Sequence, residues 1–344
     1  MPIFAVDSIS PAFQHAKEQL FHPFRLGQWT RLALVGLFAG ELSSGGGCNL
    51  NVPSTATPRH HDFLTLPNLS PTVLIPLVIV AIIAIPVLWL LFLYVNSRMR
   101  FVLFDSIIAK NCSVRQMWRA RGRPGLQYFA WQIVLSLVAL AGIAVIVGIP
   151  AGIALLLGWF AEPREHLAGL ILAGVLAFFV FFAWILLNLL VHVFTKDFVV
   201  PQMALENLSA FDGWAKLIKM LENEKVRYAG YAGMKLVLAM GAAIAVGIVA
   251  LILILVLLVP IGGLGVLSIL VGQAAGLTWN VFTITLAIVA GCIFVLVFLY
   301  GMSLISVPVI VFFPAYSMHF FAARYPLLAN LLYPPPPPLA SSGH

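Results

Sequence analysis

Residues 167–194 read LAGLILAGVLAFFVFFAWILLNLLVHVF, and this stretch decides the fold class. It contains no Asp, Glu, Lys or Arg. As a helix it would rise about 42 Å at about 1.5 Å per residue, whereas a bilayer core about 30 Å thick needs roughly 20 helical residues. Because open backbone groups find no partner in lipid, we expect a membrane-spanning helix here.

Four other segments are also long, apolar and nearly free of charge, and a fifth apolar segment is shorter. The long ones are Val73–Val95, Tyr128–Leu157, Tyr228–Val259 and about Val281–Phe313, and the short one is Trp29–Leu42. Apolar residues form 62% of the 344-residue chain and charged residues 9%, against about 45–50% and about 25% in soluble domains. These values exclude a soluble globule and a disordered chain. We predict an all-α fold, a polytopic transmembrane helical bundle of about six spans.

Prolines interrupt several of these segments. Because proline lacks a backbone N–H, Pro86 and Pro150 are expected to kink or end their helices. For the same reason Pro308 and Pro314 are expected to break the last segment.

Basic residues predict the orientation in the membrane. With six spans, all but two of the 19 Lys and Arg residues fall on one side, and only Arg59 and Arg164 fall on the other. The positive-inside rule then places both termini in the cytoplasm. We expect the chain to lie in the plasma (inner) membrane. The net charge of +7 is therefore first a topology signal, and nucleic-acid binding is not expected.

The two long basic loops resemble each other. SVRQMW at 113–118 and SAFDGW at 209–214 match at an offset of 96, and the serine and the third residue after it predict a capping box in each. RFVL at 100–103 and DFVV at 197–200 follow span exits and match at an offset of 97, one residue more. Each loop then enters a span near a tyrosine, Tyr128 or Tyr228.

The N-terminus is a weaker third copy. Ser10 is expected to cap a helix that begins with Pro11. Its apolar stripe predicts an interfacial helix, and consists of Phe13, Ala16, Leu20, Phe21 and Phe24. The pattern predicts cytoplasmic interfacial elbow helices in a three-unit repeat within one membrane domain, residues 1–333, with units of about 8–97, 98–195 and 196–316. Residues 334–344 form a Pro-rich tail that we expect to be disordered and that could recruit a protein partner.

Polar residues at membrane depth are the candidate site. Asn188 and His192 share a helix face, and Lys235 lies about two turns into the next span. One interpretation is a polar path or ligand pocket. The alternative is that Asn188 joins helices, His192 lies near the interface and Lys235 snorkels toward the cytoplasm.

Four arginines beside a span form a second candidate site. A polybasic segment of this kind binds anionic lipids, and its members are Arg115, Arg119, Arg121 and Arg123. The alternative is that these charges only determine topology. We expect no metal site, no cofactor and no catalytic centre, because no metal-ligand spacing, phosphate-binding loop or nucleophile elbow is present in the sequence.

Three stretches carry a resemblance to a known family. LFHPFRLGQWTRLALVGLFAGELSSGGGCN at 20–49, SRMRFVLFDSI with MWRARGRPG at 97–125, and DFVVPQMALENLSAFDGWAKL at 197–217 resemble an uncharacterised family of prokaryotic multi-pass membrane proteins. That family is more distantly similar to the membrane domain that accompanies some glycerophosphodiester phosphodiesterases. The resemblance covers roughly residues 8–325 and implies a six-span helical protein with no established activity.

Two functions remain open from the sequence. The first is a non-enzymatic membrane protein that acts as a scaffold, accessory or lipid-interacting module, with membrane lipids and a protein at the elbows as partners. The second is a transporter or permease component with a midplane polar site.

Overall fold

The computed structural model describes residues 4–41, 71–159, 166–274 and 281–334, and every regular element in these ranges is a helix. The elements are α1 (Ile9–Phe21), α2 (Leu26–Phe38), α3 (Pro71–Ile108), α4 (Val114–Ala120), α5 (Gly122–Leu156), α6 (Leu167–Phe194), the π-turn η1 (Thr195–Val199), α7 (Val200–Glu206), α8 (Ala210–Asn223), α9 (Lys225–Ala274), α10 (Val281–Ile305), α11 (Val307–Ala322) and α12 (Pro326–Leu332). The predicted all-α fold is confirmed for this part of the chain.

Within the described ranges, four helical stretches are long and apolar enough to cross a membrane. They are Ile82–Ile108, Gly122–Leu156, Leu167–Glu206 and Lys225–Val256. A fifth candidate is the pair Val289–Ile305 and Val307–Ala322, which is bent by 41°. All five overlap the long segments predicted from the sequence. The short segment 29–42 corresponds to α2, which has only 13 residues, so the count of six spans stays a prediction.

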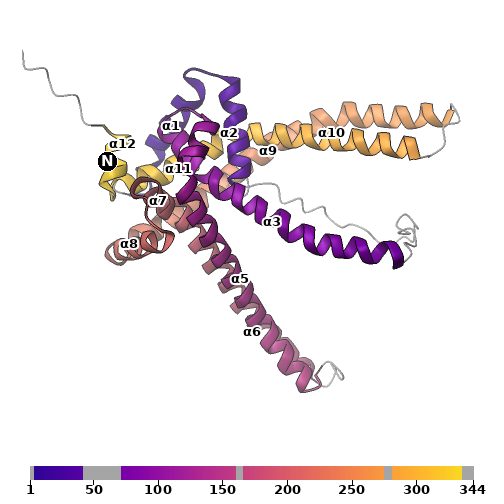
Figure 1. Cartoon of the computed structure of the whole chain (residues 1–344), viewed down its shortest axis with the longest axis horizontal. Helices are drawn as coiled ribbons and strands as arrows, with labels where there is room; N and C mark the ends of the chain where they lie inside the picture. The colour runs from indigo at the N-terminus through magenta and orange to yellow at the C-terminus, as the bar shows by residue number, and fades with distance from the viewer. Residues whose placement is uncertain (1–3, 42–70, 160–165, 275–280, 335–344) are drawn as a thin grey trace, which may run out of the picture.

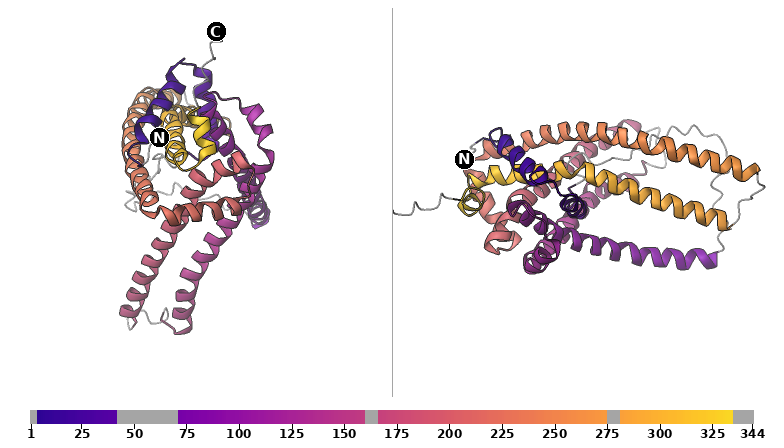
Figure 2. Two further views of the ribbon diagram at one scale, coloured as in Figure 1. Left: turned by 90° about the vertical axis from the view of Figure 1, so that its left-hand side faces the viewer. Right: turned by 90° about the horizontal axis from the view of Figure 1, so that it is seen from above.

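The helices form a compact head from which three arms project (Figure 1). The arms are α3, the hairpin of α5 and α6, and the hairpin of α9 and α10, and Figure 2 shows them in two further views. We define the head as α1, α2, α4, α7, α8, α11 and α12, together with the ends of the arm helices that meet them. The arms expose large apolar side chains, as expected of surfaces that lipid covers.

An aromatic cluster forms the centre of the head. The ring of Phe198 lies 5.2 Å from that of Tyr228, 5.0 Å from that of Tyr231 and 5.3 Å from that of Phe321, measured between centroids. Tyr231 also stacks on Phe320 at 4.6 Å. This cluster joins η1, α9 and α11, so the second and third arms share one packed root.

The prolines act differently from one another. α3 and α5 continue through Pro86 and Pro150, so neither proline ends its helix. Pro308 lies in the first turn of α11, beside the bend between α10 and α11, and Pro314 lies inside α11. Only the last segment is therefore broken, and the break falls at Ser306.

Helix α1 divides its apolar residues between two surfaces. Ala16 and Leu20 are buried in the head, whereas Phe13 and Phe21 are 63% and 50% exposed. Phe13 and Phe21 line an open groove of about 550 Å³ between α1 and α11.

The residue at the N-cap of α1 is Ser8, not Ser10, so the predicted cap is wrong by two positions. Pro11 is the third residue of the helix.

The two elbow helices begin differently. At α8, the Ser209 hydroxyl accepts a hydrogen bond from the Asp212 backbone N–H at 3.2 Å, which is the first half of the predicted capping box, and it donates to the Asp212 carboxylate at 2.6 Å. At α4, Ser113 stands at the N-cap without a side-chain capping bond, so the predicted box does not form there. Both elbows follow a residue with left-handed backbone, Lys110 with φ 51° and Asn207 with φ 54°.

The turn before each elbow helix accounts for the difference between the two sequence offsets. Phe101 and Phe198, like Lys110 and Asn207, are 97 positions apart, whereas Ser113 and Ser209 are 96 apart. The turn from Asn207 to Ser209 is one residue shorter than the turn from Lys110 to Ser113. The offset between the two elbows therefore falls from 97 to 96 in this turn.

Candidate functional site

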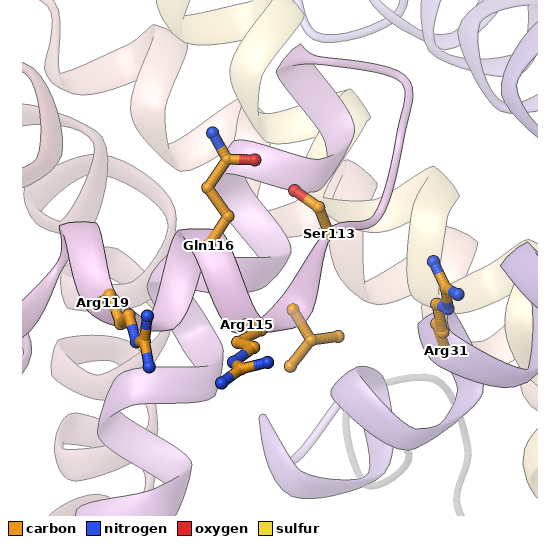
Figure 3. Close-up of a pocket in the computed structure, with 6 residues that line it drawn as sticks. Arg31, Ser113, Arg115, Gln116 and Arg119 are labelled. Carbon is orange, nitrogen blue, oxygen red and sulfur yellow. The ribbon is translucent and has the colours of Figure 1, made fainter.

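A basic cleft lies between α2 and α4. Its volume is about 860 Å³, and its lining residues are Arg31, Ser113, Val114, Arg115, Gln116 and Arg119. We call it the basic cleft. Figure 3 shows Arg115 and Arg119 extending toward the same side of α4, with Arg31 across from them on α2.

Helical spacing and one hydrogen bond set this arrangement. Arg115 and Arg119 are four residues apart, so they share a face of α4, and both are exposed. Arg31 donates through Nη1 to the carbonyl of Cys112 at 3.3 Å, which holds it beside the start of α4. Three guanidinium groups thus line one cleft whose lining includes no carboxylate, a surface suited to phosphate or carboxylate groups.

Contacts with α3 hold α4 in place. Arg98 donates to the carbonyl of Trp118 at 3.2 Å, and its guanidinium lies 5.3 Å from the ring centroid of Tyr94 and 5.2 Å from that of Trp118. Arg115 and Arg119 are therefore carried by a fixed helix although their own side chains are exposed.

The other two predicted lipid contacts lie outside the cleft. Arg121 makes a two-pronged ion pair with Asp105, with both N···O distances 2.8 Å, and also donates to the carbonyl of Ala204. It therefore ties α3 to α7. Arg123 is exposed and does not line the cleft. The four arginines of the sequence prediction thus divide into two at the cleft and two elsewhere.

A second polar group is buried where the arms meet the head. Glu41 accepts from Arg100 through Oε1 and from Lys196 through Oε2. Asp197 accepts from Lys235, and also from the hydroxyl of Tyr231 at 2.9 Å. We call Glu41, Arg100, Lys196, Asp197 and Lys235 the buried charge cluster. It joins the end of α2 to α3, η1 and α9.

The three residues of the predicted polar site have separate surroundings in the structure. Lys235 is buried and paired with Asp197. Asn188 donates to the carbonyl of Trp184 on its own helix at 2.8 Å, and His192 is exposed on α6. No hydrogen bond between any two of these three side chains is found in the described ranges. The polar path through them stays a prediction.

Sequence reasoning did not assign a role to Lys196 or Asp197 in a site, and it did not find the partners of Glu41. A signal existed, because Glu41 is the one acidic residue of segment 29–42, and buried acids in apolar segments need a partner. The convergence of Arg31 with Arg115 and Arg119 had no such signal, because it joins residues more than 80 positions apart through tertiary packing.

Groups outside the spans show the effect of burial on the head. Burial lowers the pKa of His15, although its hydrogen bond with the Ile107 carbonyl, at 2.9 Å, opposes that shift. Because a carbonyl only accepts, Nε2 carries the proton. Burial likewise raises the pKa of the Cys112 thiol at the edge of the cleft, so it is a poor nucleophile at neutral pH.

Comparison with known proteins identifies a family for this chain. No curated protein and no solved structure matches the chain. The profile of a family of unknown function, DUF7544, matches residues 3–331, nearly the whole chain. The predicted resemblance to an uncharacterised family is confirmed to that extent, and the more distant similarity to the phosphodiesterase-associated membrane domain stays a prediction. The chain belongs to the family of unknown function DUF7544.

Proposed function

We propose that this protein is a non-enzymatic integral protein of the plasma (inner) membrane that binds anionic lipid headgroups in the basic cleft. The observation that carries the proposal is the meeting of Arg31, Arg115 and Arg119 from two helices around one cleft with no carboxylate in its lining. A lipid phosphate offers the oxygen atoms that guanidinium groups bind in pairs. The protein would act as a lipid-interacting or scaffolding module.

The proposed topology agrees with this role. Six spans with both termini in the cytoplasm put the cleft on the cytoplasmic side, where anionic lipids attract basic segments. The exposed Phe13 and Phe21 of α1 support an interfacial position for the N-terminal helix beside the same surface. Reporter fusions at the two termini test the topology, since opposite sides for the termini would overturn the six-span count.

We also propose that the hairpin units are related copies. Supporting this, Phe101 meets Tyr128 edge-on at 5.9 Å and Phe198 meets Tyr228 edge-on at 5.2 Å. In each case an aromatic residue at a span exit packs on the tyrosine that enters the next span. A protein partner at the elbows or at the tail is a further part of this proposal.

Lipid binding is tested on the purified chain in detergent. Fluorescent phosphatidylglycerol and phosphatidylcholine are titrated, and retained lipids are counted by native mass spectrometry. Each of Arg31→Gln, Arg115→Gln and Arg119→Gln is expected to weaken phosphatidylglycerol binding about fivefold, because a basic residue near an anionic surface contributes about 1 kcal/mol. High salt should reduce the difference.

Arg123→Gln is the matched control. It removes the same charge from an exposed position outside the cleft, so binding should change by less than about twofold. If it weakened binding as much as the cleft substitutions, or if wild type bound both lipids equally, the proposal would be wrong.

A transporter role is the second candidate. The buried charge cluster favours it, because ionisable groups among membrane helices mark ion or substrate pathways. Flux measurements in proteoliposomes test it, with Lys235→Met as the variant. Flux unchanged by that substitution would remove Lys235 from any path.

A further inference from the structure

The buried charge cluster holds more positive than negative charge. Arg100, Lys196 and Lys235 are cations, and Glu41 and Asp197 are the carboxylates. The charged groups that interact with Lys196 in the described residues are the other four members of this set. With every group in its ordinary ionised form, the cluster carries one excess positive charge. The five side chains are nearly excluded from solvent, with 1–10% of each exposed.

A small cavity opens inside this cluster. Its volume is about 20 Å³, and Glu41, Arg100, Lys196 and Asp197 line it together with Ser317 and apolar side chains from α3, α7 and α11. A cavity needs about 10–15 Å³ to hold one water molecule. The space therefore admits a single water or a monatomic ion, and it excludes phosphate, sulfate and organic acids.

Arg100, which lines the cavity, has a hydrogen-bond donor, Nε, that no described residue uses. Its side chain is 5% exposed, with Nη1 bound to Glu41 and Nη2 to the carbonyl of Ala39. Its buried Nε has no hydrogen-bond partner among the described residues. A buried charged donor without a partner is costly, so such a group indicates a bound water or ion.

We propose that the cavity binds one monovalent monatomic anion, for which chloride is the candidate. The excess positive charge selects an anion over a neutral water and over any cation, and the volume selects a halide over larger anions. The anion accepts from Arg100 Nε and neutralises the cluster. In this way it strengthens the contact of α2 with α3 and η1.

The test measures thermal unfolding of the purified full chain in detergent. Sodium chloride is compared with sodium gluconate at equal ionic strength, because gluconate is too large for the cavity. Chloride is expected to raise the melting temperature in a saturable way, and gluconate is not. Equal effects of the two salts would overturn the proposal.

Two substitutions and one control locate the effect. Lys196→Met removes the excess charge, so the chloride dependence of the melting temperature should disappear. Arg100→Lys keeps the charge but lacks Nε, so it should weaken chloride binding at least tenfold. Lys219→Met on α8 is the control, since Lys219 is exposed, and it should leave the chloride dependence intact. Loss of the dependence in the control would overturn the assignment to the cluster.

A structural readout remains if the variants do not fold. Wild-type crystals soaked in bromide should show an anomalous peak within hydrogen-bond distance of Arg100 Nε. Density at the cavity without anomalous signal would identify a water and overturn the anion site. Failure here leaves lipid binding untouched, since the basic cleft shares no residue with the cavity.

Discussion

Arg100 and Lys196 donate to the two different oxygens of one buried carboxylate, that of Glu41. They lie 96 positions apart in the sequence. Arg100 belongs to the first arm, and Lys196 is at the root of the second. One acidic residue after α2 therefore joins the first arm to the base of the second.

Glu41→Gln should strongly destabilise the head. The substitution leaves two buried cations without their carboxylate, and breaking a buried ion pair in this way costs about 3–5 kcal/mol. Unfolding of the purified protein in detergent measures the loss. The control is Glu18→Gln, which breaks an exposed pair with Lys110 and should change stability little. Equal losses in the two variants would contradict the role of Glu41.

Stability should fall as the pH drops below about 6.5. The pKa of His15 in the folded chain lies below its ordinary value of 6.5, because burial disfavours the charged ring. Above that pH both folded and unfolded chains hold a neutral ring, and below it the unfolded chain takes up a proton more readily. The neighbouring groups Glu18, Lys110 and His319 face the same ring.

Melting temperatures at pH 7.5 and pH 5.5 measure this effect. His15→Gln should make the decrease at low pH smaller, whereas His22→Gln, at the exposed C-cap of α1, should leave it as in wild type. An unchanged decrease in the His15 variant would show that another group is responsible.

Gly142→Ala should separate the hairpin of α5 and α6. A Cβ atom at Gly142 would lie 2.2 Å from the ring of Trp184, whose indole N–H donates to the Ala139 carbonyl at 3.2 Å. Overpacking of this kind costs about 1–3 kcal/mol. Gly148→Ala on the same helix meets no atom within 4 Å and should be neutral. Disulfide cross-linking of cysteine pairs across the hairpin would report the difference.

Arg121→Lys should weaken the head without affecting lipid binding. Lysine cannot form the two-pronged pair with Asp105, so a loss of about 1–2 kcal/mol is expected. Because Arg121 does not line the basic cleft, the affinity of the Arg121→Lys variant for phosphatidylglycerol should stay within twofold of wild type. A large loss of lipid affinity in the folded variant would return Arg121 to the list of lipid contacts.

The sequence predicted the arms well because length and apolarity are local properties. The predicted segment Leu167–Phe194 begins and ends at the same residues as α6. The sequence predicted the N-terminal ends of the elbow helices less well. Ser209 forms its cap with Asp212, but Ser113 does not cap α4. A capping bond depends on the backbone angles of the N-cap residue, and these differ between the two serines.

The sequence by itself determined the helical class, the long apolar segments and the uneven placement of the basic residues. Only the tertiary structure decided which charges meet. Arg115 and Arg119 join Arg31 in a cleft, Arg121 turns to Asp105, and Lys235 finds Asp197. The physical reason is that hydropathy and helical spacing act within one segment, whereas an ion pair depends on distance between side chains that chain folding brings together.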